Sequence, residues 1–167
     1  MVSSGENYVR MKVALFYLKG KSEDWADRAC EDYAQKIQYF TKFERVAIKS
    51  KSLDRDNKLE KISAESEAIL GKIQKSDAVI LFDESGSQFK NSVEFSNKFI
   101  SYYGGSNSRI VFIIGGPYGF SDEVKSRAVA RWSLGSLTMN HHVAQVAALE
   151  QIYRAFTIWK GLPYHNP

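Results

Sequence analysis

The chain has 167 residues, a formal net charge of +4 at pH 7 and a pI of about 9.1. This length fits one domain with its own core, and 44% hydrophobic residues exclude a largely disordered chain. The single cysteine, Cys30, excludes an intramolecular disulfide and a zinc site built from several thiolates. We expect a soluble, cytoplasmic protein, because no apolar run reaches the length of a membrane helix and residues 1–10 lack a signal-peptide core. The modest basic excess suits a polyanionic partner such as a nucleic acid.

The hydrophobic pattern alternates between strand and helix periods along the chain. We interpret residues 1–10 as an extension and residues 11–167 as a single domain. In chain order, the pattern predicts a strand at 11–18, a helix at 23–40, a strand at 43–48, a loop at 49–58, a helix at 59–75, a strand at 77–83, a loop at 85–90, a helix at 91–103, a strand at 109–114, a short helix after Ser121, a short strand or loop at 132–137 and a helix at 141–160. We expect Ser22 to cap the first helix and Ser121 to cap the short one. The strands at 77–83 and 109–114 are continuously apolar, which is typical of strands covered on both faces. The sequence therefore predicts an α/β fold with a mostly parallel sheet and helices on both faces.

Two polar loops stand where a parallel sheet places its ligands, after the carboxyl ends of strands. The first is the glycine-rich turn 115–119, where glycines allow a close approach of the backbone to a ligand. It matches neither a dinucleotide fingerprint nor a Walker loop, so a plain tight turn and a ligand loop both stay open. The second is SLGSLTMNHH, residues 133–142, which precedes an apolar helix. It is either a loop capped by Thr138 or Asn140, or a surface whose backbone groups hydrogen-bond an adenine or ribose.

The last predicted helix carries an ion pair in an apolar setting. Glu150 and Arg154 are four residues apart, which places them on one helix face, as a structural pair or around a functional arginine. Histidines occur only near the carboxyl end, at His141, His142 and His165. We expect the adjacent pair to point to different helix faces, and HExxH is absent, so we predict no metal site. A general base or an RNA contact is the functional interpretation of these histidines, and helix capping is the structural one.

At this point the motifs resemble a known family. IIGGPYGFSDEV at residues 113–124 and WSLGSLTMNHHVAQVAALEQIYRAFTIWKGLPYH at residues 132–165 are similar, in motif order and spacing, to the RlmH-type bacterial methyltransferases of the SPOUT superfamily. The similarity is strong over residues 109–165 and collinear from Met11. It implies an α/β sheet with a C-terminal trefoil knot and a homodimer with its active site at the subunit interface. It also implies methylation of N3 of a pseudouridine in 23S ribosomal RNA on the assembled ribosome, with S-adenosylmethionine as donor.

The resemblance also assigns the site residues. The cofactor would be held by three loops, through Phe82, Gly115, Gly116, Leu134, Gly135, Ser136, Leu137, Thr138, Met139 and Asn140. The substrate side would be formed by His141, Tyr153, Arg154, Tyr164 and His165. N3 of pseudouridine must lose a proton, so His165 or His141 is the candidate base, and Arg154 would stabilise the developing anion. Trp132, Tyr118 or Tyr164 would stack on an RNA base.

Some positions depart from the family pattern. Gln145 stands where an arginine is usual, Asn140 replaces a common proline, and the tail ends in Asn166 and Pro167 where a basic residue normally follows the histidine. The missing cations leave two alternatives open. One is a non-catalytic ribosome-binding factor of the same fold, and the other is a methyltransferase that acts on a different RNA. We expect neither a membrane nor a metal partner.

Overall fold

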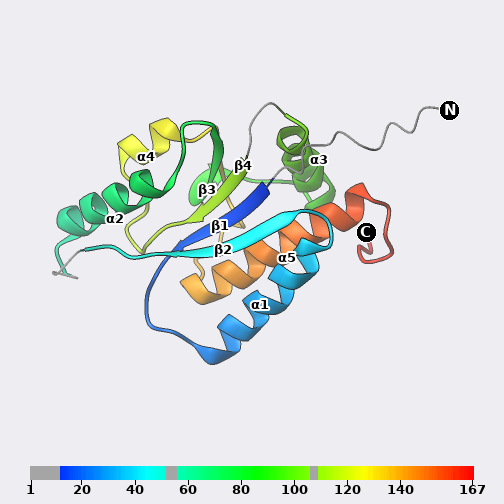
Figure 1. The fold of residues 1–167 in the computed structure, drawn as a ribbon, viewed down its shortest axis with the longest axis horizontal. Helices are drawn as coiled ribbons and strands as arrows, with labels where there is room; N and C mark the ends of the chain where they lie inside the picture. Colours follow the sequence, from blue (N-terminus) through cyan, green and yellow to red (C-terminus); the bar gives the residue numbers. More distant parts are fainter. Residues whose placement is uncertain (1–11, 52–55, 106–108) are drawn as a thin grey trace.

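The computed structural model describes residues 12–51, 56–105 and 109–167, so the predicted extension lies outside the described residues. The elements in chain order are β1 (Lys12–Leu18), α1 (Asp24–Gln38), β2 (Lys42–Ile48), α2 (Lys58–Lys72), β3 (Asp77–Ser87), α3 (Ser92–Tyr103), β4 (Arg109–Ile114), α4 (Asp122–Arg127), β5 (Ala130–Trp132) and α5 (His141–Trp159). The strands form one parallel sheet in the order β2-β1-β4-β3-β5. Helices α1, α3 and α5 cover one face and α2 and α4 the other (Figure 1). The predicted α/β architecture is confirmed, and the trefoil knot stays a prediction.

The two faces of the sheet carry separate hydrophobic clusters. Along β1, Val13 packs toward α1 and α5, whereas its neighbour Ala14 packs toward α2 and α4, as the alternation of strand side chains requires. The larger cluster is rich in aromatic rings. The ring of Phe99 lies 5.3 Å from that of Phe112 and 5.2 Å from that of Phe156, which joins α3, β4 and α5. This packing fixes α5 against the sheet.

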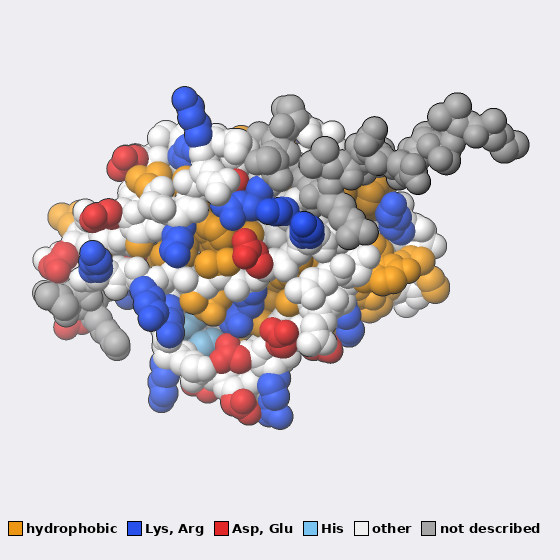
Figure 2. All heavy atoms as spheres, in the orientation of Figure 1, with side chains coloured by type: hydrophobic (Ala, Val, Ile, Leu, Met, Phe, Trp, Pro, Cys, Tyr) orange, Lys and Arg blue, Asp and Glu red, His pale blue; other side chains and the backbone are white. Residues whose placement is uncertain are grey.

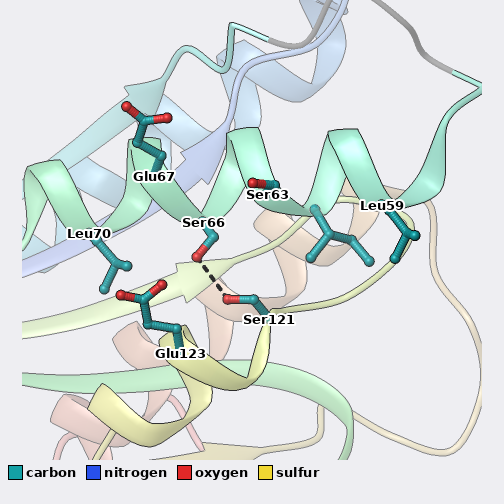
Figure 3. A pocket seen from close by; sticks show the side chains of 8 residues that line it. Leu59, Ser63, Ser66, Glu67, Leu70, Ser121 and Glu123 are labelled. Carbon is teal, nitrogen blue, oxygen red and sulfur yellow. Dashed lines mark hydrogen bonds between the residues drawn. The ribbon is translucent and has the colours of Figure 1, made fainter.

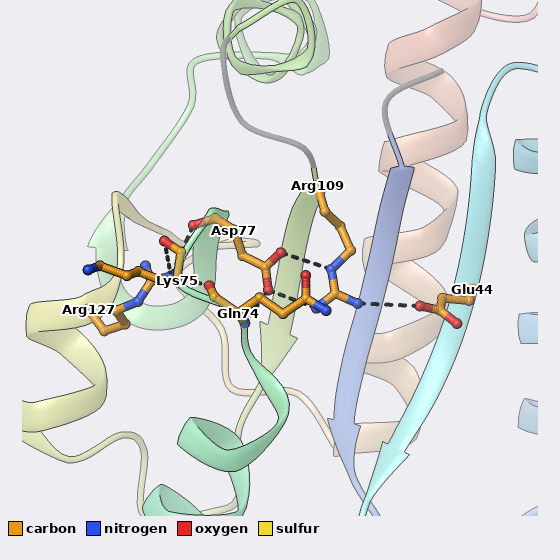
Figure 4. A network of polar contacts seen from close by, with 6 residues as sticks. All are labelled: Glu44, Gln74, Lys75, Asp77, Arg109 and Arg127. Atoms are coloured by element: carbon orange, nitrogen blue, oxygen red, sulfur yellow. Dashed lines mark hydrogen bonds and ion pairs between the residues drawn. The ribbon is translucent and has the colours of Figure 1, made fainter. Parts of the chain in front are cut away.

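The amino-terminal edge of the sheet is held by a buried ion pair (Figure 4). Arg109 donates from Nε to Asp77 Oδ1 at 3.0 Å and from Nη2 to Oδ2 at 2.7 Å, and these bonds raise the pKa of its guanidinium. Glu44 adds a longer ion pair at 3.5 Å. Arg127 of α4 donates to three backbone carbonyls between α2 and β3, including that of Gln74 at 2.6 Å. The starts of β2, β3 and β4 are thereby joined at the edge opposite the predicted loops.

Two of the three N-cap residues predicted from the sequence cap their helices in the structure. Ser121 accepts from the backbone N–H of Val124, and Asn140 accepts from that of His142, so both caps are confirmed. The Ser22 cap is wrong. The N-cap of α1 is Glu23, whose side chain makes no capping bond, because the Ser22 hydroxyl donates to the Asp27 carboxylate instead.

The bounds of β3 and of its neighbour β5 differ most from the prediction. β3 continues to Ser87 instead of ending at residue 83, because Ser87 resumes pairing with Trp132 after an irregularity in the ladder. β5 covers only Ala130–Trp132, whereas a strand or loop was expected at 132–137. Within the described part of the chain, no helix is long and apolar enough to cross a bilayer.

Candidate active site

The three loops predicted to hold the cofactor lie together at the carboxyl edge of the sheet. Phe82 pairs in register with Ile114 on one side and with Trp132 on the other. The glycine pair at 115–116 directly follows Ile114, and the loop 133–140 directly follows Trp132. These two loops therefore follow the strands on either side of β3, and Phe82 lies within β3 between them. Loops at the carboxyl ends of parallel strands form the ligand sites of open α/β sheets.

The glycine loop is closely packed from the α2 side. A Cβ built on Gly116 would lie 2.5 Å from Oε1 and 2.6 Å from Oε2 of Glu65, a residue of α2 that is only 5% exposed. Only glycine fits here while the carboxylate holds its place. Burial raises the pKa of the Glu65 carboxyl, with the nearby charge of Lys61 acting against it. α2 is further tied to the loop because the hydroxyls of Ser66 and Ser121 lie 2.8 Å apart.

The arrangement fits a cationic ligand with several hydrogen-bond donors. Glu65 Oε2 is buried and has no hydrogen-bond partner among the described residues. Asp83 Oδ2, beside Phe82, likewise receives no hydrogen bond there and lies 3.6 Å from Arg131 Nη1. Buried acceptors without donors are costly, so carboxylate oxygens without hydrogen bonds beside the glycine loop and beside Phe82 favour a ligand with N–H, O–H or positive charge. S-adenosylmethionine carries all three.

The third loop is held by its own polar contacts. Ser133 donates from Oγ to the carbonyl of Gly135 at 2.7 Å and accepts from its N–H at 3.1 Å. Asn140 then begins α5. Between these two anchors, residues 136–138 are exposed. The adenine interpretation requires an accessible loop of this kind.

A polar cluster surrounds the ion pair of α5. Glu150 Oε1 accepts from Arg154 Nε at 2.9 Å, from Arg154 Nη2, and from the Tyr164 hydroxyl at 3.2 Å. Burial raises the pKa of Tyr164 to about 12, helped by a hydrogen bond with Tyr33 and by the charge of Glu150. Arg154 Nη1 lies 3.2 Å from His165 Nδ1. Three predicted substrate residues are therefore brought together.

This cluster depends on the way the chain leaves α5. Gly161 has a φ of +68°, and the N–H of Leu162 donates back to the carbonyl of Thr157 at 2.9 Å. The tail turns back along the helix, so Tyr164 lies on its last turns. There the Arg154 guanidinium stands 4.8 Å from the centre of the Tyr164 ring. The PYH motif at residues 163–165 thus lies in a segment that turns back along α5.

His141 lies far from that cluster in the same chain. It begins α5, and thirteen residues of helix separate it from Arg154, or about 20 Å along the axis. Burial, then the neighbouring charge of His142, lowers its pKa. The expectation that the two histidines diverge is wrong, since their ring centroids are 3.9 Å apart. Among the described residues, no group of three metal-ligating side chains occurs.

A cavity of about 550 Å³ connects the third loop with the polar cluster. Leu134 and Gly135 of the third loop and Glu150 of the polar cluster line it. The rest of the lining combines apolar and aromatic side chains of α1, α3 and α5 with polar ones, among them Gln88, Ser92 and Gln151. A second groove, of about 420 Å³, lies between α2 and α4 (Figure 3). None of the predicted site residues lines that groove.

Gln145, at the position where the resemblance expects arginine, is buried and its side chain is hydrogen-bonded. Its Oε1 accepts from Arg45 Nε at 3.1 Å and from Arg45 Nη2 at 2.8 Å. The same guanidinium pairs with Asp27 and lies 4.3 Å from the centre of the Tyr17 ring. A cation from β2 therefore stands against this position of α5, and Asp27 balances its charge.

Comparison with known proteins agrees with this geometry. The family model described as "Predicted SPOUT methyltransferase" matches residues 11–165. The chain is 45% identical over 156 residues to the ribosomal RNA large subunit methyltransferase H of Bdellovibrio bacteriovorus, covering 93% of this chain and 99% of that protein. It is 37% identical over 160 residues to the protein of the same name from Bacteroides thetaiotaomicron, with the same coverage.

The chain belongs to the SPOUT methyltransferases. Solved structures agree in fold. A probable rRNA-methyltransferase from Porphyromonas gingivalis has a TM-score of 0.53 at 16% identity, covering 90% of this chain and 70% of that one. A probable methylase family protein from Haemophilus influenzae has a TM-score of 0.55 at 12% identity, covering 93% and 69%.

Sequence reasoning missed several residues that shape this candidate site. Glu65 lies under the glycine loop, Arg45 faces α5, and Tyr33 supports the returning tail. A charged residue on an otherwise buried helix face was the one signal for Glu65. The other two reach their partners only through the tertiary fold.

Proposed function

We propose that this SPOUT methyltransferase transfers a methyl group from S-adenosylmethionine to N3 of a pseudouridine in 23S ribosomal RNA of the assembled ribosome. The supporting observation is that Phe82 of β3 and the two predicted cofactor loops meet at one sheet edge, beside buried carboxylate oxygens that receive no hydrogen bond within the described residues. The relatives' name supports the RNA class. A ribosomal substrate also agrees with a cytoplasmic location.

The cofactor and the protein make different contributions to the proposed reaction. When bound, S-adenosylmethionine supplies an electrophilic methyl group, so positioning is the main task left to the protein. Gly116 and the loop 133–140 would hold it with backbone groups. Glu65 and Asp83 would accept from its donors or balance its positive charge.

On the substrate side, we propose that Arg154 and His165 stabilise the ionised base. A guanidinium only donates, so Nδ1 of His165 accepts and the neutral ring carries its proton on Nε2. Both side chains then offer N–H donors, which suit the oxygen atoms that gain charge when N3 loses its proton. His141, whose pKa is lowered, is the neutral imidazole suited to accept that proton.

This division of roles needs two subunits. An antiparallel pair of α5 helices would bring His141 of one protomer toward Arg154 of the other, which a single chain keeps about 20 Å apart. The α1–α5 face has the required apolar surface, since Trp25 is 51% and Val143 44% exposed. We therefore propose a homodimer with the active site at its interface.

The test is transfer of labelled methyl groups from S-adenosylmethionine to ribosomes that lack the modification, with free subunits and tRNA as controls. We expect label in large-subunit RNA of whole ribosomes. Arg154→Lys loses the planar donor set, so kcat should fall about 10²–10³-fold while cofactor affinity is kept. Arg28→Lys, at an exposed ion pair, is the matched control and should keep full activity. Label only in another RNA, or no label despite cofactor binding, would contradict the proposal.

A further inference from the structure

The carboxyl edge of the sheet is basic beyond the three cofactor loops. Four exposed lysines follow the ends of the neighbouring strands β1 and β2, and we call them the edge lysines: Lys19, Lys21, Lys49 and Lys51. They lie close together because Leu18 pairs with Ile48 in register and the N–H of Lys19 donates to the carbonyl of Ile48 at 2.8 Å. Two short loops thus place four positive charges at one end of the sheet.

The edge lysines are not neutralised locally. None of them forms an ion pair with a carboxylate in the part of the chain that the structure describes. Two acidic residues at the start of α1 are already engaged, Asp24 with Arg28 and Asp27 with Arg45, which leaves Glu23 as the one carboxylate there that offsets part of this charge. The positive potential of this edge is therefore available to a partner.

The edge lysines also adjoin the proposed active site. A Cβ built on Gly20, between two of them, would lie only 3.3 Å from Nε2 of His141. Figure 2 shows Lys and Arg side chains over the loop that follows β1, beside the exposed surface of a histidine. β1 is in turn the direct neighbour of β4, whose end carries the glycine loop. One continuous edge thus carries the lysines, His141 and the cofactor loops.

We propose that the edge lysines contact the phosphate backbone of the ribosomal RNA strand on which the enzyme acts. The inference rests on the proposed function and adds the surface that holds the substrate. Lysines are flexible point charges that neutralise phosphates without reading sequence, so they set the position of the strand while the active site selects the base. The four are spread over two loops, which suits an extended strand better than a single anion.

Counterion release gives the expected size of the effect. Each phosphate contact to a single strand contributes about 0.7 to the slope of log K against log salt. Four contacts amount to a slope of about 3, or a roughly 50-fold loss of affinity between about 50 and 200 mM salt. Removing the edge lysines should remove that part of the salt dependence.

The experiment measures binding of the full-length protein to unmodified ribosomes over a KCl series, without methyl transfer as the readout. One variant carries Lys→Gln at all four edge lysines. The matched control carries Lys→Gln at four exposed lysines at or near the opposite edge: Lys12, Lys42, Lys72 and Lys75. Both variants lower the formal net charge from +4 to 0. Protein-free large-subunit RNA serves as a second ligand.

We expect the edge variant to bind ribosomes at least tenfold more weakly at low salt and with a slope shallower by about 3, while the control keeps wild-type behaviour. Equal losses in both variants, or no loss in the edge variant, would overturn the proposal. A loss on ribosomes without a loss on protein-free RNA would also overturn it, because the lysines would then contact a ribosomal protein. Normal binding by a protein that transfers no methyl group would refute the proposed function and leave the surface intact.

Discussion

The contact between the glycine loop and α2 predicts a cofactor-binding defect from a single added methyl group. In Gly116→Ala the new Cβ would meet the two carboxylate oxygens of Glu65 at 2.5 and 2.6 Å and its Cδ at 2.9 Å. Glu65 is 5% exposed, so either its buried carboxylate or the loop must shift to admit the methyl group. Overpacking of this kind costs about 1–3 kcal/mol. If the shift is reversed on binding, affinity for S-adenosylmethionine falls about 5- to 150-fold.

Calorimetric titration with S-adenosylmethionine and thermal unfolding measure the two consequences separately. Gly104→Ala is the matched control, since a Cβ there meets nothing within 4 Å, and it should bind the cofactor normally. Glu65→Ala removes the atoms that the methyl group meets, so Gly116→Ala should cost less cofactor affinity in the Glu65→Ala background than in the wild type, whatever Glu65→Ala costs by itself. Wild-type affinity in Gly116→Ala, or an equal loss from Gly116→Ala in both backgrounds, would refute the reasoning.

Three further predictions concern stability, pH and assembly. Asp77→Asn leaves the Arg109 guanidinium, which is 13% exposed, without its carboxylate, so urea unfolding should show that the free energy of unfolding falls by about 3–5 kcal/mol. Glu44→Gln removes a carboxylate whose side chain is 59% exposed and should lower the free energy of unfolding by about 1 kcal/mol or less. Equal losses in the two variants would contradict the buried-pair account. The pKa of His141 in the folded protein is lowered from 6.5, so as the pH falls the unfolded chain binds a proton before the folded one does. The free energy of unfolding of the wild type should therefore fall more steeply below pH 6.5 than that of His141→Gln. Parallel curves for the two proteins would contradict this. Val143→Glu, placed on the proposed dimer face, should give monomers by light scattering that still bind the cofactor, whereas an unchanged mass would argue against that interface.

The fold was predictable because its signals are local. Continuous apolar strands and amphipathic helices are visible within windows of a few residues, and Asn140 marks the start of α5 by its own capping chemistry. The errors occur where a partner distant in sequence decides. β5 ends at Trp132 because its pairing with β3 ends there, and Ser22 is diverted from capping by Asp27.

The site was predictable only in part for the same reason. The resemblance assigned loops whose strands are adjacent in the sheet, and it placed Arg154, Tyr164 and His165 in one cluster. It gave no indication that Arg45 meets Gln145, because these residues are 100 positions apart. Glu65 beneath Gly116 is likewise a contact between elements that no periodicity reports. The binding and catalytic roles of all these residues stay predictions.

The most direct test of the central proposal identifies the product. Large-subunit RNA from unmodified ribosomes treated with the enzyme and S-adenosylmethionine would be digested to nucleosides and analysed by mass spectrometry against an untreated sample. The account predicts a single new methylated nucleoside, pseudouridine methylated at N3, and its absence when Arg154→Lys replaces the wild type. A methyl group on any other nucleoside, or only on RNA other than that of the large subunit, would contradict it.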